Sequence, residues 1–63
     1  MTIQDLYESC DNINFFSTKV VITDSEQNIL VWNKMLSAVP SNLLQLEVEH
    51  FKIIDEEVII WTP

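Results

Sequence analysis

The sequence predicts an α+β fold in which an N-terminal helix packs on a four-stranded, mainly antiparallel sheet made of two hairpins. Apolar side chains recur at helical spacing from residue 3 to about residue 11. Four stretches rich in β-branched and aromatic residues follow, at residues 19–23, 29–36, 46–54 and 58–62. Polar segments divide these stretches into two pairs, with a short helical turn between the pairs. We therefore expect residues 1–63 to form a single small domain.

Thr2 and Asp5 predict the start of the helix. Their spacing is that of a capping box, with Asp in place of the usual Glu. The apolar stripe that follows consists of Ile3, Leu6, Tyr7 and Cys10, and Ile13 continues it. Asp11 opposes the helix dipole at the C-terminal end, and together with Asn12 and Asn14 it favours termination there.

The first predicted strand, residues 19–23, places Val20 and Ile22 on one face. The polar segment DSEQN that follows is typical of a turn. Because the chain contains no glycine, Asn28 or Asp24 is the best candidate for a left-handed backbone position in that turn. We therefore expect a hairpin between this strand and the next apolar stretch.

The second predicted strand, residues 29–36, carries apolar side chains on both of its faces. One face receives Leu30, Trp32, Lys34 and Leu36, and the other receives Ile29, Val31, Asn33 and Met35. A single helix covers one face of a sheet only, so apolar surface that includes Trp32 and Trp61 is left for a dimer or another partner. Alternatively, loops and the second helical turn cover this surface. The sequence leaves both alternatives open.

Pro40 interrupts the pattern after the first hairpin, because a proline disfavours helical dihedral angles at the residue before it. Ser41 or Asn42 is then placed to cap a single helical turn over residues 43–45. We expect this turn to lead from the first hairpin to the second.

The end of the chain predicts the second hairpin. Its strands are residues 46–54 and 58–62, with Asp55 and Glu56 at the turn. Val48 and Phe51 cannot share a face of a regular strand, because an odd number of steps separates them. We therefore expect a bulge near His50, which would bring both apolar side chains to the same face.

The charge of the chain excludes several functions. Three Lys, no Arg and ten acidic residues give a formal charge of −7, whereas proteins that bind nucleic acid directly carry clustered cations. The same charge attracts basic protein surfaces and keeps a small apolar protein in solution.

No apolar run approaches the roughly 20 residues of a membrane span, and the N-terminus lacks signal-peptide features. We expect a cytoplasmic protein with no nucleic-acid or membrane partner.

No combination of residues predicts a reaction. His50 is the only histidine, and Glu47 and Glu49 lie on the other side of a regular strand from it. Cys10, the only cysteine, excludes an intramolecular disulfide and lies on the apolar stripe without a cationic neighbour. The segment DSEQN lacks the central glycine and terminal glutamate of an EF-hand loop. The sequence therefore predicts a protein that is not an enzyme and holds no metal or cofactor.

The acidic residues predict a contact surface. Glu47 and Glu49 alternate along one predicted strand about 6–7 Å apart, close to the spacing of successive phosphates in a nucleic-acid strand. Five more carboxylates extend this surface if the two hairpin turns lie at one end of the sheet: Asp24, Glu26, Asp55, Glu56 and Glu57. Such a surface would mimic nucleic acid and occupy a basic groove. The alternative reading, in which the charged turns are merely solvated, stays open.

Three stretches carry a resemblance to known proteins. The opening MTIQDLYES, the middle PSNLLQLEVEHFKI and the terminal EVIIWT together resemble short acidic proteins encoded by phages and mobile elements of Gram-positive bacteria. Proteins of that kind include anti-CRISPR inhibitors, several of which use acidic surfaces against the cationic nucleic-acid channels of their targets. The resemblance implies an inhibitor of a nuclease.

Two functional hypotheses follow. The first is a non-enzymatic, acidic protein-interaction module that blocks a basic nucleic-acid-binding site on a partner protein. Its acidic contacts would be Glu47, Glu49, Asp55, Glu56, Glu57, Asp24 and Glu26. The second is a homo-oligomeric structural or adaptor subunit, such as a homodimer, whose contact surface is an apolar sheet face with Trp32 and Trp61.

Overall fold

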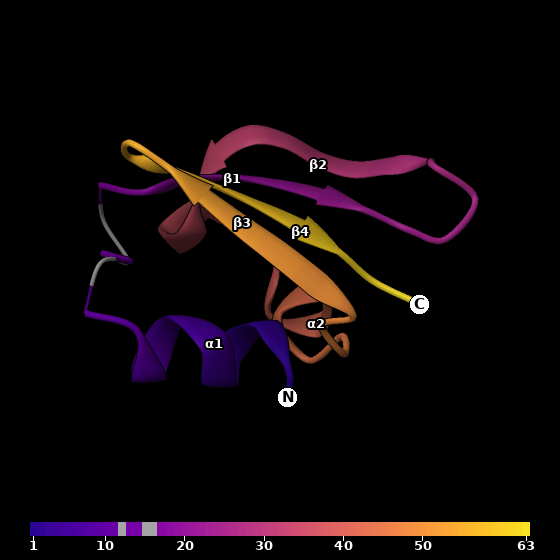
Figure 1. The fold of residues 1–63 in the computed structure, drawn as a ribbon, viewed down its shortest axis with the longest axis horizontal. Helices are drawn as coiled ribbons and strands as arrows, with labels where there is room; N and C mark the ends of the chain where they lie inside the picture. The colour runs from indigo at the N-terminus through magenta and orange to yellow at the C-terminus, as the bar shows by residue number, and fades with distance from the viewer. Residues whose placement is uncertain (12, 15–16) are drawn as a thin grey trace.

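A four-stranded mixed sheet forms one layer of the fold, and the helices lie on one side of it (Figure 1). The computed structural model describes residues 1–11, 13–14 and 17–63. The described elements, in chain order, are α1 (Ile3–Ser9), β1 (Lys19–Thr23), β2 (Ile29–Met35), the 3-10 helix η1 (Leu36–Ala38), α2 (Ser41–Leu44), β3 (His50–Ile54) and β4 (Glu57–Trp61). The expected α+β class is confirmed.

The strands lie in the order β2-β1-β4-β3, with β1 parallel to β4 and both hairpins antiparallel. The prediction of a mainly antiparallel sheet is therefore wrong. Residues 20–22 and 58–60 are uninterrupted apolar triplets, which favour central over edge positions in a sheet. The other two strands contain Asn33, Lys34 and Lys52, whose polar side chains suit the edges of a sheet. The two hairpins consequently join through their most apolar strands.

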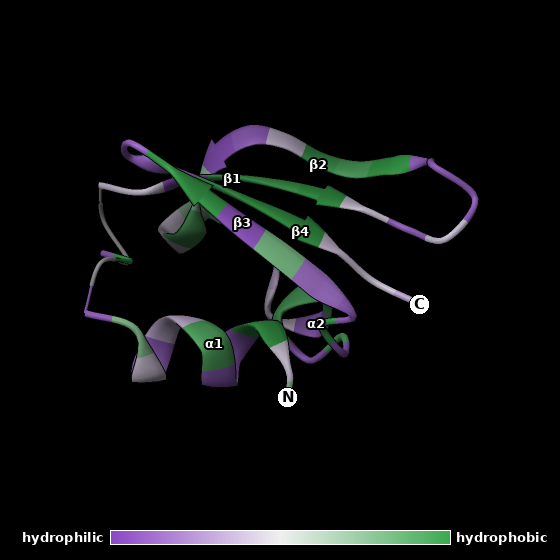
Figure 2. Ribbon diagram, viewed as in Figure 1, coloured by the Kyte–Doolittle hydropathy of each residue, from purple (hydrophilic) through white to green (hydrophobic). Residues whose placement is uncertain are grey.

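The core lies between the sheet and the helices. In the parallel register Val20 pairs with Val58 and Ile22 pairs with Ile60, and all four side chains are buried. They pack in one cluster with buried residues of the helical layer, namely Ile3, Leu6, Leu36, Val39 and Leu44. The hydropathy colouring shows that both central strands are apolar over most of their length (Figure 2). Because side chains alternate along a strand, the neighbours of these four residues point away from the helices.

Helix α1 begins with the capping box that Thr2 and Asp5 predict. The Thr2 hydroxyl accepts a hydrogen bond from the Asp5 N–H at 3.1 Å, and an Asp5 carboxylate oxygen accepts one from the Thr2 N–H at 3.1 Å. The helix ends at Ser9, about two residues earlier than predicted. The Ser9 hydroxyl donates to backbone carbonyls of the preceding turn, and Cys10 is already extended. Asn12, expected to help end the helix, lies outside the described residues.

The left-handed backbone positions differ from those predicted. Positive φ angles occur at Gln27, Asn33 and Asp55. The prediction of Asn28 or Asp24 is therefore wrong. Asp24 instead uses its side chain, because its Oδ1 accepts hydrogen bonds from the N–H groups of Glu26 and Asn28, both at 2.9 Å. These bonds close the β1–β2 turn around the Asp24 carboxylate and leave Gln27 as the left-handed residue.

Strand β2 does not keep the strict alternation predicted for residues 29–36. Its register against β1 shifts twice, and Asn33 has a φ of 53°. Val31 is the one buried residue of this strand. Leu36, predicted as its last residue, instead opens η1 and is buried. Irregularities of this kind twist an edge strand and discourage its pairing with another chain.

Two short helical segments, η1 and α2, connect the hairpins, rather than the single turn predicted over residues 43–45. The prediction that Ser41 or Asn42 caps this turn is wrong. Pro40 occupies the N-cap position of α2, with a φ of −57° that its ring already favours. Buried Leu44 anchors α2 to the core.

Strand β3 begins at His50 instead of residue 46, and its register with β4 is uninterrupted. The bulge predicted near His50 is therefore wrong. The chain before the strand pairs with the N-terminus, because the Val48 N–H donates to the Met1 carbonyl at 2.8 Å. Val48 packs against the core from this position outside the strand. Because Val48 lies outside strand β3, the side chains of Val48 and Phe51 need not alternate as they would within one regular strand.

Candidate protein-interaction surface

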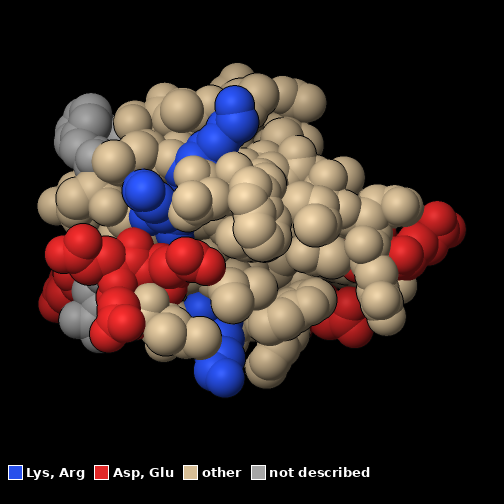
Figure 3. Space-filling view, turned by 90° about the horizontal axis from the view of Figure 1, so that it is seen from above, with Lys and Arg blue, Asp and Glu red and all other residues tan. Residues whose placement is uncertain are grey.

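The sheet face that points away from the helices is the open face of the molecule. It is defined by the alternation of side chains and by the register of the strands. The open face comprises Lys19, Val21, Thr23, Ile29, Trp32, Met35, His50, Lys52, Ile54, Glu57, Ile59 and Trp61. Figure 3 looks onto this side and shows mostly uncharged atoms, with basic side chains nearer one end and acidic side chains at both ends.

Apolar side chains of the open face are most exposed on the two edge strands. Trp32 is 65% exposed, and Ile29, Ile54 and Met35 are 56%, 45% and 37% exposed. Trp61, on a central strand, is half-buried, and its ring centroid lies 5.0 Å from that of His50. Both tryptophans predicted for an apolar contact surface therefore lie on the open face. Only Trp32 presents most of its surface to solvent.

The parallel pairing of β1 and β4 places the two hairpin turns at opposite ends of the sheet. The β1–β2 turn follows the C-terminal end of β1, whereas the β3–β4 turn precedes the N-terminal end of β4. Asp24 and Glu26 therefore lie at one end, and Asp55, Glu56 and Glu57 lie at the other (Figure 3). The condition for a single acidic patch, both turns at one end, is not met. The open face instead has two acidic ends.

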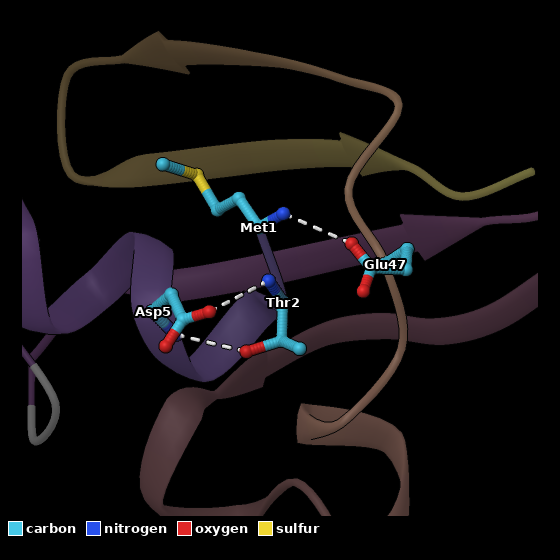
Figure 4. A network of polar contacts seen from close by, with 4 residues as sticks. All are labelled: Met1, Thr2, Asp5 and Glu47. Atoms are coloured by element: carbon cyan, nitrogen blue, oxygen red, sulfur yellow. Dashed lines mark hydrogen bonds and ion pairs between the residues drawn. The ribbon is translucent and has the colours of Figure 1, made fainter.

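Glu47 is engaged in a contact within the molecule. Its Oε2 forms an ion pair with the Met1 amino group at 2.9 Å (Figure 4), and this hydrogen bond raises the pKa of the amino group. An isolated antiparallel bridge also joins Glu47 to Thr2. Because Glu47 and Glu49 both precede β3, no regular strand enforces the phosphate-like spacing predicted for their carboxylates.

A hollow of about 660 Å³ lies at the Asp24 end of the open face, and we call it the Trp61 hollow. Its lining consists of Thr23, Asp24, Ser25, Gln27, Ile29, Glu49, His50, Trp61 and Thr62. The backbone of Glu49 is fixed here by a hydrogen bond from its N–H to the Trp61 carbonyl at 2.8 Å. The hydrogen bond from the Asn28 N–H is the main cause that lowers the pKa of Asp24. Asp24 consequently stays ionised to lower pH than an ordinary aspartate.

A second hollow, of about 320 Å³, lies at the other end. Its lining consists of Ser17, Lys19, Ile54, Asp55, Glu56 and Glu57. Lys19 is the register partner of Glu57 on the parallel strand, so positive charge adjoins this acidic turn. Asp55 and Glu56 form the predicted turn and are exposed. The two ends thus differ, because the lining of the Trp61 hollow contains no lysine.

The residues considered for catalysis are brought together only in part. His50 and Glu49 both line the Trp61 hollow, although a regular strand would place them on opposite sides, and Cys10 does not line it. His50 is exposed and its ring lies beside that of Trp61. Cys10 is half-buried and packs against the core. Within residues 1–11, 13–14 and 17–63, no three His, Cys, Asp or Glu side chains are grouped so as to hold a metal ion.

Comparisons with protein-family models, with curated proteins and with solved structures find no match to this chain. In the part of the chain that the structure describes, no helix is long and apolar enough to cross a membrane. The open face and its two acidic ends are therefore the features that indicate a function.

Proposed function

We propose that this protein is a non-enzymatic protein-interaction module whose contact surface is the open face. One observation supports this above all: the sheet is packed on one side, and its other side presents Trp32 with 65% of its surface exposed. Exposed apolar residues that gather on one face mark contact surfaces in small soluble proteins. Tryptophan is also among the residues that contribute most to the free energy of binding.

The partner that fits the open face is a protein with an apolar centre and a basic rim. Burial of a large apolar side chain contributes about 1.5–3 kcal/mol, so joint burial of Ile29, Trp32 and Ile54 favours a specific complex. The acidic ends and the formal charge of −7 speed association with a cationic surface and oppose association with an acidic one. The chemistry of the face therefore selects the class of partner.

Affinity capture tests the assignment of the open face. The tagged protein should retain a partner from a lysate of the cells that produce it, and Trp32→Ser should weaken retention by about tenfold or more. Phe51→Ser is the matched control, because Phe51 is 37% exposed but shares the core-facing side of the sheet with buried Ile60. Equal retention by the wild type and Trp32→Ser would sink the proposal.

A more specific candidate is an inhibitor that blocks a basic nucleic-acid-binding site on a nuclease, as the resemblance to anti-CRISPR proteins implies. It is favoured by the carboxylates at both ends of the open face (Figure 3), which would meet cations that otherwise hold phosphates. Glu47 contributes less, because the Met1 amino group already pairs with it. On this proposal the captured partner binds nucleic acid, and the inhibitor and the nucleic acid compete.

Charge reversal tests this candidate. Asp55→Lys and Glu56→Lys at one end, and Glu26→Lys at the other, should each weaken capture and restore nucleic-acid binding by the partner, because opposite charges become like charges. Glu8→Lys is the charge-matched control, since Glu8 is exposed on α1, on the other side of the sheet. Capture that is indifferent to all of these reversals and to added salt would exclude the inhibitor.

A second copy of the chain is the other candidate occupant of the open face. Lys19 and Lys52 lie on this face together with the exposed Trp32. A twofold axis across the strands would bring the lysines of one copy toward the Asp24 end of the other. Sedimentation at high protein concentration measures the oligomeric state. A wild-type dimer that becomes a monomer in Trp32→Ser supports this occupant, and a wild-type monomer excludes it.

A further inference from the structure

We propose that the Trp61 hollow binds a cationic side chain of the partner, and that arginine is the side chain that fits it. This inference rests on the proposed function, because it names the group on the partner that one end of the open face recognises. It is carried by the shape of the hollow, by its charge and by its aromatic lining.

The hollow is an open depression whose floor is held by backbone hydrogen bonds. Its volume of about 660 Å³ lies within the range of about 300–1,000 Å³ that small-molecule sites occupy. The β1–β2 turn supplies Asp24 as one wall, and Glu49, directly before β3, supplies the other. Between them lies the end of β4, where the N–H and hydroxyl of buried Thr62 both donate to the Thr23 carbonyl, at 2.8 and 3.2 Å. These bonds hold the walls at a set separation.

The charge of the lining selects a cation. Asp24 and Glu49 are its two carboxylates, and none of the three lysines of the chain lines the hollow. Asp24 is held in the charged form by the hydrogen bonds that it accepts within its own turn, which lower its pKa. Both carboxylate oxygens of Asp24 accept hydrogen bonds within the turn, since the Asn28 side-chain amide also donates to Oδ2 at 3.2 Å. Glu49 is therefore the carboxylate that would pair with the cation directly, and the negative charge of Asp24 adds to the attraction.

The aromatic lining favours arginine over lysine. The ring centroids of His50 and Trp61 lie 5.0 Å apart, with an interplanar angle of 39°, and both rings line the hollow. The face of an indole attracts a cation, and a planar guanidinium stacks on it as well. The N–H groups around the edge of a guanidinium can at the same time donate to a carboxylate such as that of Glu49. Lysine has the charge but lacks the planar face.

Titration with Nα-acetyl-L-arginine amide tests the site directly. In the isotope-labelled protein, the NMR signals of the Trp61 indole N–H and of the Gln27 and Glu49 amides should shift and saturate. The expected dissociation constant is on the order of millimolar, as suits a single side chain in an open site. Nα-acetyl-L-citrulline amide is the matched probe, because it has a similar shape and carries no charge. It should produce no saturating shift.

Two variants complete the test. Glu49→Gln should weaken arginine binding about fivefold to tenfold, because it replaces a charged acceptor by a neutral one. Glu8→Gln should leave the affinity unchanged, because Glu8 is exposed on α1, on the other side of the sheet from the hollow.

The proposal is overturned if the shifts do not saturate, if citrulline reproduces them, or if Glu49→Gln leaves them unaltered. It is also overturned if the shifts gather at residues 55–57 instead. In each of these cases the protein would still retain its partner, and Trp32→Ser would still weaken that retention. Failure of the arginine site is therefore distinguishable from failure of the proposed function.

Discussion

At the scale of single residues, the N-terminus is fastened by a small network of polar contacts. The Met1 amino group pairs with Glu47 (Figure 4). The Met1 carbonyl also accepts a hydrogen bond from the Val48 N–H. The capping box of Thr2 and Asp5 begins α1 directly after these contacts. The network ties the first turn of the helix to the segment before β3, and so helps to hold α1 on the packed side of the sheet.

Removal of the Thr2 hydroxyl tests the importance of the helix start. Thr2→Ala should lower the free energy of unfolding by about 1 kcal/mol, the usual cost of losing an N-cap side chain. Thr2→Ser should retain most of that free energy, because its hydroxyl can still accept from the Asp5 N–H. Denaturant unfolding followed by circular dichroism measures both variants. Equal stability of Thr2→Ala and the wild type would show that packing alone fixes α1.

The Asp24 carboxylate predicts a defined dependence of stability on pH. Its pKa in the folded protein lies below the ordinary value of 3.8 because of backbone hydrogen bonds from its turn. A carboxylate with a lowered pKa stabilises the fold above about pH 4, and this contribution is lost as the pH falls through the folded pKa. Asp24→Asn should therefore be less stable than the wild type at pH 6, and this difference should shrink toward pH 2. A difference that is constant across this range contradicts the assignment.

At the scale of elements, the β1–β2 turn is closed by Asp24 and contains Gln27 in a left-handed conformation with a φ of 65°. The left-handed conformation costs a residue with a Cβ roughly 1–2 kcal/mol, and glycine adopts it without this cost. The chain contains no glycine. The turn therefore retains strain that a single substitution can relieve.

Gln27→Gly should raise the free energy of unfolding by up to about 1 kcal/mol, the steric gain less the greater chain entropy of glycine. Ser25→Gly is the matched control in the same turn, because Ser25 does not have a positive φ, and it should be neutral or destabilising. Thermal unfolding of both variants checks the prediction. Stabilisation by Ser25→Gly rather than Gln27→Gly would contradict the described turn.

The elements that the sequence predicts correctly depend on neighbouring residues. The capping box at Thr2 and Asp5 and the turn at Asp55 and Glu56 each involve a few adjacent positions. The features that it does not predict depend on distant partners. Strand β3 starts at His50 because the segment before it pairs with the N-terminus, a contact that no local pattern indicates.

At the scale of the whole molecule, the parallel pairing of β1 and β4 decides how the surface is arranged. It places the two apolar strands side by side at the centre and sends the two acidic turns to opposite ends. The helices cover one face of this sheet, and the other, open face has exposed apolar side chains on its edge strands and carboxylates at both ends (Figures 1 and 3). One topological feature thus accounts for both the apolar and the acidic parts of the proposed contact surface.

The candidate site is predictable from the sequence only in part. Apolar surface at Trp32 and Trp61 follows from the presence of apolar side chains on both faces of the strands. The Trp61 hollow does not, because Asp24, Glu49 and Trp61 come from three separate segments that meet only in this strand order. The sequence shows which carboxylates are present. Which of them lie together depends on contacts between residues that are far apart in the chain.

Site-specific photo-crosslinking tests most directly the central claim that the open face is the contact surface. One form carries p-benzoylphenylalanine in place of Trp32, and a second form carries it in place of Glu8, which is exposed on α1 on the other side of the sheet. In the cells that produce the protein, the form altered at position 32 should yield a discrete crosslinked adduct, and the form altered at position 8 should yield none. Equal crosslinking from both positions, or crosslinking from position 8 alone, would contradict the account.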